Sequence, residues 1–360
     1  MQYVFTKIKC LFFTSFFLIA FSSLNAQSLF EEVEERSIPI TSKRYTIPAS
    51  FKSFAIDLPA LLNFLEQAPE EFSVDIRNSS VILSLPMPNG SMQDFFIVKS
   101  AIMPAELSAK YPSIHSYLAQ GLDDASATAR ISISNNGFHA MIISASGTTY
   151  IDPFSINNPS HCIVYNKKDF YATNEKVRAA ECFINEAQAN AKAMVAGRSG
   201  DVLRVFKAAI ACTGEYAQFH ANSSGDEASV AALAAINVSI NRVNVVFERE
   251  ASFRLNLIEN NDLIVYVNSV TDPYSNSNAS SILAANQENL DDLIGSANYD
   301  IGHVFSTGAG GLASQGVCNS NFKAKGVTGT NAPINDPYDI DYVAHEIGHQ
   351  FGANHTFNGD

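Results

Sequence analysis

Three histidines near the carboxyl end of the chain, His345, His349 and His355, have the spacing of ligands to one metal ion. On a helix, residues four apart lie one above the other, so His345 and His349 can direct imidazole nitrogens at a single ion. Gly352 allows the left-handed turn that ends a helix, and the reversed chain can return His355 as a third ligand. Three neutral nitrogen ligands leave the fourth position of tetrahedral zinc open. The spacing therefore predicts a catalytic rather than a structural zinc site.

Glu346 directly follows the first of these histidines and is predicted to act as a general base. A carboxylate at this position can hold a metal-bound water and take its proton. A short H-E-x-x-H match also arises by chance in helices, where the histidines are ordinary hydrogen-bonded residues. The longer pattern over residues 345–355 fixes five positions and favours the metal site over a chance match.

Residues 345–355 carry the consensus H-E-x-x-H-x-x-G-x-x-H, and here the chain resembles the metzincin zinc endopeptidases. The glycine-rich stretch at 311–318 is similar to the segment that follows the substrate-binding edge strand in reprolysin (adamalysin-like) members. The resemblance implies zinc bound by His345, His349 and His355, with Glu346 as catalytic base. It also implies an α+β or α/β catalytic domain, with a mixed twisted sheet, two long helices and the zinc helix, and a cleft beneath the lower edge strand.

Two features depart from the adamalysin pattern. Thr356 and Phe357 follow the third histidine where adamalysins usually carry an aspartate, and this pairing is similar to the pappalysin branch, the second choice of subfamily. The clan's methionine-containing turn does not occur before Asp360. We therefore expect residues 199–360 to be the N-terminal part of a metzincin catalytic domain, truncated before the Met-turn, in a longer protein.

The chain before the histidines must supply the sheet and helices that hold them. Apolar runs predict strands at 203–211, 252–258, 263–267 and 299–306. Helical spacing predicts a long helix, opened by a capping box at 224–227, and a second helix at 280–294.

The predicted strand at 299–306 is expected to be the sheet edge to which an extended substrate adds as another strand. His303 lies on this strand, and we interpret it as structural because three better-spaced histidines already fill the metal site. Asp339 and Asp341 precede the zinc helix and are expected to cap its start, with a calcium site as the alternative.

Residues 27–198 are expected to form a β-rich propeptide domain that also assists folding. Short apolar runs predict strands at 73–76, 81–85, 95–98, 129–133 and 138–144. Asn136 and Gly137 mark the turn of a hairpin between the last two. The composition near 181–200 is that of a linker, and we predict maturation close to Arg198, with an uncut hinge as the alternative.

Cys182 lies near the end of this propeptide and is a candidate zymogen switch. In metzincin precursors a cysteine thiolate can occupy the open position on zinc and displace the catalytic water. The alternatives for Cys182 are a structural disulfide or a buried thiol. Together with Cys162, Cys212 and Cys318, Cys182 makes four cysteines after the signal peptide. Export of the protein to an oxidising compartment would permit one disulfide bridge in each half of the chain.

Residues 1–26 have the pattern of a secretory signal peptide. Lys7 and Lys9 form a positive n-region, residues 11–21 are almost entirely apolar, and Ala26 offers a small residue at the cut. A membrane anchor is the alternative, but the apolar run is shorter than the roughly 20 residues that span a bilayer. No later run is long and uniformly apolar enough to cross a membrane. We therefore expect a secreted, extracellular protein without membrane association after signal removal.

Composition sets the remaining bounds. Hydrophobic residues make up 46% and charged residues 16% of the chain, which suits two globular domains. The net charge of -13 and the lack of basic runs exclude nucleic acid as an expected partner. We expect a monomer that acts on protein or peptide substrates.

These observations together predict a secreted zinc endopeptidase made as a zymogen. The alternative is a catalytically silent secreted zinc-binding or adhesion module. A third interpretation is a β-rich extracellular binding protein in which the histidine pattern is incidental.

Overall fold

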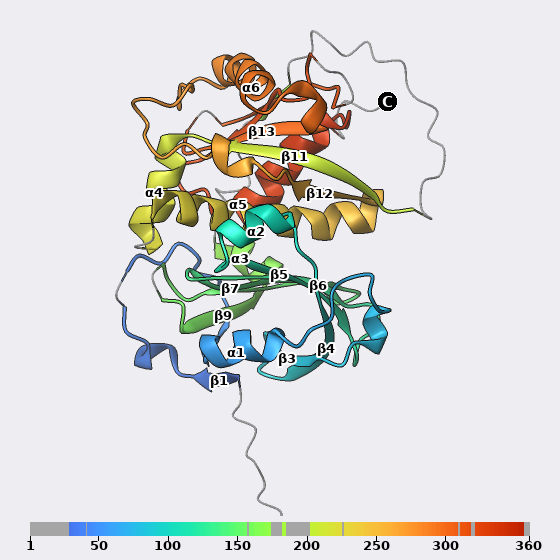
Figure 1. Ribbon diagram of the computed structural model, residues 1–360. Helices are drawn as coiled ribbons and strands as arrows, with labels where there is room; N and C mark the ends of the chain where they lie inside the picture. The colour runs from blue at the N-terminus through green and yellow to red at the C-terminus, as the bar shows by residue number, and fades with distance from the viewer. Residues whose placement is uncertain are drawn as a thin grey trace, which may run out of the picture.

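Two β-sheets with a long helix between them make up the computed structural model (Figure 1). It describes residues 29–40, 42–156, 158–173, 182–184, 202–224, 227–308, 310–317 and 321–355. The expected signal peptide at 1–26 lies outside these ranges. We call residues 29–173 the N-terminal unit and residues 202–355 the C-terminal unit.

The N-terminal unit is built on a nine-stranded antiparallel sheet with the order β1-β2-β9-β8-β7-β6-β5-β4-β3. Its strands are β1 (Phe30–Val33), β2 (Lys52–Ile56), β3 (Ile82–Pro86), β4 (Met92–Lys99), β5 (His115–Gly121), β6 (Thr128–Ser134), β7 (Gly137–Ser144), β8 (Gly147–Pro153) and β9 (His161–Asn166). Its helices are α1 (Leu58–Leu65), α2 (Ala105–Lys110) and α3 (Lys167–Thr173), with 3-10 turns at Glu35–Ser37 and Ile76–Asn78.

The hairpin expected around Asn136 and Gly137 is confirmed. Strands β6 and β7 pair antiparallel from Ser134 opposite Gly137, and Gly137 has a φ of 120°, which a residue with a side chain rarely adopts. The strands predicted at 81–85 and 95–98 are also confirmed, as β3 and β4.

The strand predicted at 73–76 is wrong. The Asp75 side chain accepts a hydrogen bond from the Arg77 amide at 2.9 Å and caps a 3-10 turn at Ile76–Asn78. An aspartate that bonds the backbone two residues on offers the chain an alternative to strand pairing, and apolar spacing alone does not reveal it.

The C-terminal unit has a mixed six-stranded sheet with the order β10-β14-β15-β13-β11-β12. Its strands are β10 (Cys182–Ile184), β11 (Arg204–Cys212), β12 (Phe253–Leu257), β13 (Ile301–Ser306), β14 (Gly311–Ala313) and β15 (Gly326–Gly329). Strands β11, β12, β13 and β15 run parallel, whereas β14 is antiparallel to β15. Strand β10, which precedes the unit in sequence, pairs parallel with β14.

Helices cover both faces of this sheet. They are α4 (Gly214–Ser224), α5 (Ala228–Ala251), α6 (Ala279–Leu293) and a continuous run of α7 (Asn335–Tyr338), the π-helical η7 (Asp339–Ala344) and α8 (His345–Gln350), with 3-10 turns η5 (Asn261–Ile264) and η6 (Ser296–Asn298). Alternate residues of β11 face opposite sides, as strand geometry requires. Ala208 and Ile210 join the core beneath α5 and α8, and Ala209 and Ala211 join the core beneath α6.

Three predictions for this unit need correction. The strand expected at 263–267 is not formed, because η5 turns the chain and the Asn261 side chain pairs with the backbone of Ile210 in its place, at 2.8 and 2.9 Å. The expected edge strand at 299–306 is β13, which lies inside the sheet between β11 and β15. The expected capping box is also wrong, because Ser224 ends α4 and Glu227 caps α5 without a side-chain hydrogen bond.

Helix α5 lies between the two sheets and packs against β6 and β7 on one side and β12 on the other (Figure 1). By length and composition alone it is the one helix, among those described, that could cross a membrane. This corrects the expectation that no segment after residue 26 has that character. Most of α5 is buried, as in the core helix of a globular protein.

Candidate metal centre

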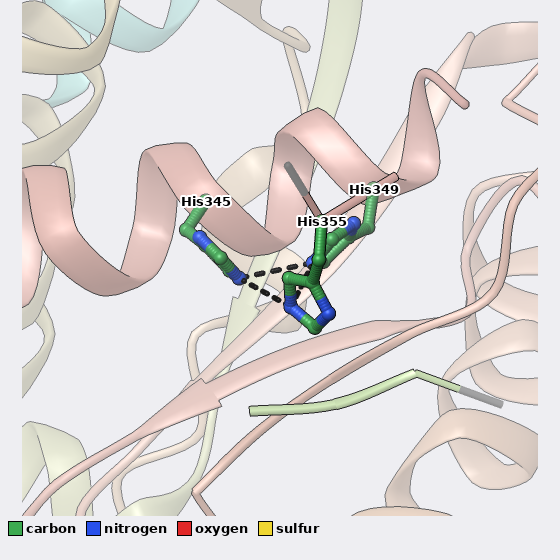
Figure 2. A group of neighbouring side chains, drawn as sticks. All are labelled: His345, His349 and His355. Carbon is green, nitrogen blue, oxygen red and sulfur yellow. Dashed lines mark hydrogen bonds between the residues drawn. The ribbon is translucent and has the colours of Figure 1, made fainter. Parts of the chain in front are cut away.

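The helical run at residues 335–350 ends in the turn that the sequence predicts. Gly352 has a φ of 96°, its amide donates to the His349 carbonyl at 2.9 Å, and the Ala353 amide donates to the Gly348 carbonyl at 3.0 Å. This left-handed residue closes the last helical turn and reverses the chain. The reversal brings His355 back beside α8, as Figure 2 shows.

The three histidines converge on one point. Their Nε2 atoms are 2.9 Å apart for His345 and His349, 3.2 Å for His349 and His355, and 3.3 Å for His345 and His355 (Figure 2). Two zinc–nitrogen bonds of about 2.05 Å that open at a tetrahedral angle place their nitrogens about 3.3 Å apart. The residues therefore fit a zinc ion with three protein ligands.

The tautomer of His349 suits a metal ligand. Its Nδ1 lies 2.7 Å from the Ala353 carbonyl oxygen, which can only accept, so Nδ1 carries the proton and Nε2 offers a lone pair to the metal point. Burial, opposed by that hydrogen bond, lowers the pKa of His349. Burial and the two neighbouring histidines lower the pKa of His345 to about 4. Both rings are thus neutral at physiological pH, as metal binding requires.

Glu346 follows His345 on α8 and is buried, with 1% of its surface exposed. Its carboxylate passes directly over Gly311 of strand β14, where an added Cβ atom would lie 2.2 Å from Oε1. The close approach places the carboxylate against strand β14. A carboxylate there can take a proton from a water that attacks a chain aligned on β14.

Gln350, the residue after the second histidine, fixes α8 to the sheet and was missed by the sequence analysis. Its amide donates to the Gly302 carbonyl at 2.9 Å and its Oε1 lies 2.7 Å from Nδ1 of His303. Nε2 of His303 lies 2.8 Å from the Thr328 hydroxyl. His303 is fully buried in this network and is structural, as expected. Gln350 occupies a position of the histidine motif at which any residue is allowed, so the motif gives no signal for its role.

Asp339 and Asp341 do not cap a helix, because they lie within the helical run and not at its start. Asp339 is buried and accepts hydrogen bonds from Arg242 at 3.0 Å and from Ser239 at 2.5 Å. Burial raises the pKa of Asp339 to about 6. Asp341 accepts from the Tyr171 hydroxyl. Both carboxylates therefore belong to a contact with helix α5 and with the N-terminal unit.

Export would permit a bridge in each half of the chain, but Cys162 and Cys212 are buried free thiols. Each occupies an apolar core position, where burial raises the pKa of the thiol far above its ordinary range. The backbone of Cys182 lies in β10, opposite Gly311 of β14 in the register. Its side chain is outside what the structure describes, as is Cys318.

Comparison with known protein families bears directly on this site. Residues 233–356 match the reprolysin-like metallo-peptidase family M12B. The matched segment begins within α5 and includes Glu346 and all three histidines, so the part of the chain that is similar to this metallopeptidase family is the part that holds the candidate metal site. It covers about a third of the 360 residues.

Two further comparisons add little. A search of curated proteins finds no match. The solved structure titled "Crystal Structure of metalloproteinase-II from Bacteroides fragilis" is similar, with 11% identity, a TM-score of 0.43, and coverage of 84% of this chain and 87% of that chain. A likeness this weak supports no conclusion about the chain.

Proposed function

We propose that the protein is a secreted zinc endopeptidase of the metzincin type, made as an inactive precursor. The observation that carries the proposal is the convergence of three imidazole nitrogens at zinc spacing beside the buried carboxylate of Glu346. The family match of the same residues supports peptide hydrolysis as the reaction. A signal peptide at 1–26 and a monomeric, extracellular product belong to the proposal.

In this mechanism His345, His349 and His355 hold zinc, which when bound polarises a carbonyl and makes water more acidic. Glu346 accepts a proton from the water while the water oxygen bonds to the scissile carbonyl carbon. The carbon–nitrogen bond then breaks, and Glu346 passes the proton to the leaving amine. The carboxylate is restored, so each cycle consumes one water and yields one acid and one amine.

Strand β14 is the part of the sheet that we propose aligns the substrate. A peptide that adds to its outer edge gains main-chain hydrogen bonds and is carried past Gly311, next to Glu346. Strand β10 occupies this edge, with Cys182 opposite Gly311. The precursor is therefore proposed to be inactive because its own residues 182–184 take the substrate's place.

The Cys182 thiolate is proposed to add a metal ligand to this block, since its backbone lies level with the Glu346 carboxylate along β14. Cys182→Ser should then raise the activity of the uncut precursor, because a hydroxyl is a poor zinc ligand. The assay is cleavage of a fluorogenic peptide library by the uncut protein. Equal activity of the two precursors would show that β10 blocks the site without the thiolate.

The mechanism is tested by replacing the base and one ligand separately. Glu346→Ala should keep one zinc per chain and lose about 10²- to 10⁴-fold in kcat/KM, the usual contribution of a general base. His349→Ala should lose both zinc and activity. Zinc content is measured by mass spectrometry and kcat/KM on the matured full-length protein. Bound zinc without turnover in the unmutated protein would favour the silent binding module.

A further inference from the structure

Charged side chains that are buried in the folded chain pair across the boundary between the two units. Arg242 of α5 donates to Asp152 of β8 and to Asp339, and the side chains of Arg242 and Asp152 are 3% and 1% exposed. Although burial alone would raise it, the charge of Arg242 holds the pKa of Asp152 well below its usual range. His139 and Tyr165 also bond this carboxylate, at 2.9 and 2.7 Å. The surroundings of Asp152 therefore favour its ionised form, which pairs with Arg242.

A second buried group lies next to the first along α5, toward the carboxyl end of the helix. Arg130 of β6 has a side chain 1% exposed and donates to Glu248 at 2.5 Å and to Asn241 at 3.1 Å. Arg254 of β12 donates twice to Glu71, at 2.7 and 2.8 Å. Each unit thus contributes both signs of charge, and three of these ion pairs cross the boundary: Arg242–Asp152, Arg130–Glu248 and Arg254–Glu71. Separation would leave these groups without the partners that compensate their burial.

The apolar contacts are also continuous across the boundary. Ile102, Met103, Leu107 and Ile114 of the N-terminal unit belong to the same buried cluster as Leu233 and Ile236 of α5. Burial of apolar side chains together with paired charges is typical of permanent interfaces, whereas interfaces that open readily are smaller and wetter. The boundary has the character of a protein interior.

These contacts lie away from the metal point. They involve α5 and residues 336–341, at the opposite end of the helical run from Gly352 and His355. The edge of β14 beside Glu346 is instead covered by the three residues of β10. The segment that blocks the site and the surface that joins the two units are therefore separate parts of the fold.

We propose that the N-terminal unit stays bound to the metallopeptidase unit after the linker is cut, as a permanent second chain, and that departure of β10 alone opens the substrate edge. The second clause rests on the proposed function, because it assumes that β14 aligns a substrate. The first clause does not, since association of the two units requires no catalysis.

The test uses the full chain carrying Glu346→Ala, so that no self-digestion occurs. Recognition sequences for one sequence-specific protease are inserted after Asn174 and after Arg198, and the folded protein is cut at both. We expect the chains on either side to co-elute in gel filtration at 0.15 M and at 1 M NaCl, because salt screens buried ion pairs little. The excised peptide with β10 should elute alone. Separation of the two chains at 0.15 M NaCl would overturn the first clause, and retention of the peptide would overturn the second.

Variants identify what holds the chains together. Asp152→Asn should weaken their association by about 30-fold or more, since it leaves Arg242 buried with one carboxylate fewer. The matched control is Lys110→Gln, which breaks a cross-boundary ion pair to Asp262 of 2.8 Å whose lysine is 49% exposed. It should change the dissociation constant by less than about fivefold. Equal effects of the two would overturn the role of the buried charges.

A milder variant keeps the test decisive if Asp152→Asn does not fold. Ser116→Ala removes one buried hydrogen-bond partner, at 3.0 Å, from Asn237 of α5. The association should weaken about 5- to 100-fold, and no change would again overturn the proposal. Co-elution with no peptidase activity in the matured wild type would leave this inference standing and refute the proposed function.

Discussion

Gly311→Ala is the sharpest test of how the fold places Glu346, the proposed catalytic base. The new Cβ atom would lie 2.2 Å from Oε1 and 2.7 Å from Cδ of Glu346, whereas ordinary contact begins at 3.4 Å. The carboxylate must therefore retreat by about 1.2 Å, the difference between the first and last of these distances. A misplacement of about 1 Å at a reacting group costs about 10²-fold, or about 2.7 kcal/mol in transition-state free energy.

The assay is kcat/KM for a peptide substrate together with zinc content and the free energy of unfolding. Zinc should be retained, because the three heavy atoms nearest to the added carbon all belong to Glu346 and none to a histidine. Gly348→Ala is the matched control: the same change on the zinc helix meets nothing within 4 Å and should leave kcat/KM within about twofold while stabilising the helix by up to about 1 kcal/mol. A Gly311→Ala enzyme with unchanged kcat/KM would refute the placement of Glu346.

Three further predictions concern the structural residues around the site. Gln350→Ala should destabilise the fold by about 2–4 kcal/mol in urea unfolding, because it leaves buried partners of the zinc helix unsatisfied, whereas Gln315→Ala, at an exposed hydrogen bond, should stay within about 0.5 kcal/mol. Burial lowers the pKa of His303 to about 4, so the unfolded chain binds a proton at this side chain more tightly than the folded chain does. The free energy of unfolding should therefore fall as pH falls from about 6.5 to 4, by on the order of 3 kcal/mol. His303→Gln should remove that part of the pH dependence, as measured by urea titrations at about pH 7 and about pH 4.5. Cys162 and Cys212 should not react with a thiol reagent until the protein unfolds, and rapid labelling of the native state at either site would contradict their buried positions.

The convergence of the three histidines was predictable because its signals are local. The spacing of His345, His349 and Gly352 follows from helix and turn geometry within eleven residues, and the structure realises the turn and the convergence. The hairpin at Gly137 was predictable for the same reason. Each of these features depends on residues that are close in sequence.

The errors have the opposite cause. No local pattern shows that the residues after Ile301 form an inner strand, since an inner and an edge strand differ in their neighbours and not in their own sequence. The pairing of Arg242 with Asp152 joins residues ninety positions apart, and nothing in the sequence near either residue predicts it. For the same reason Asp339 was interpreted as a helix cap when its partner lies on α5.

The π-helical stretch η7 sets the angle around the helix axis between Asp339 and His345, two side chains of one helical run. Asp339 at its start faces α5, and His345 directly after it faces the metal point. A π turn takes up more residues than an α turn, so η7 adjusts the helical phase between these two side chains. Five residues of a plain α-helix, which turns by about 100° per residue, turn through about the same angle as the six residues of η7. The wide turn therefore accommodates one extra residue between Asp339 and the histidines without turning His345 away from the metal point, so the conformation of this stretch is as much a part of the site as its ligands.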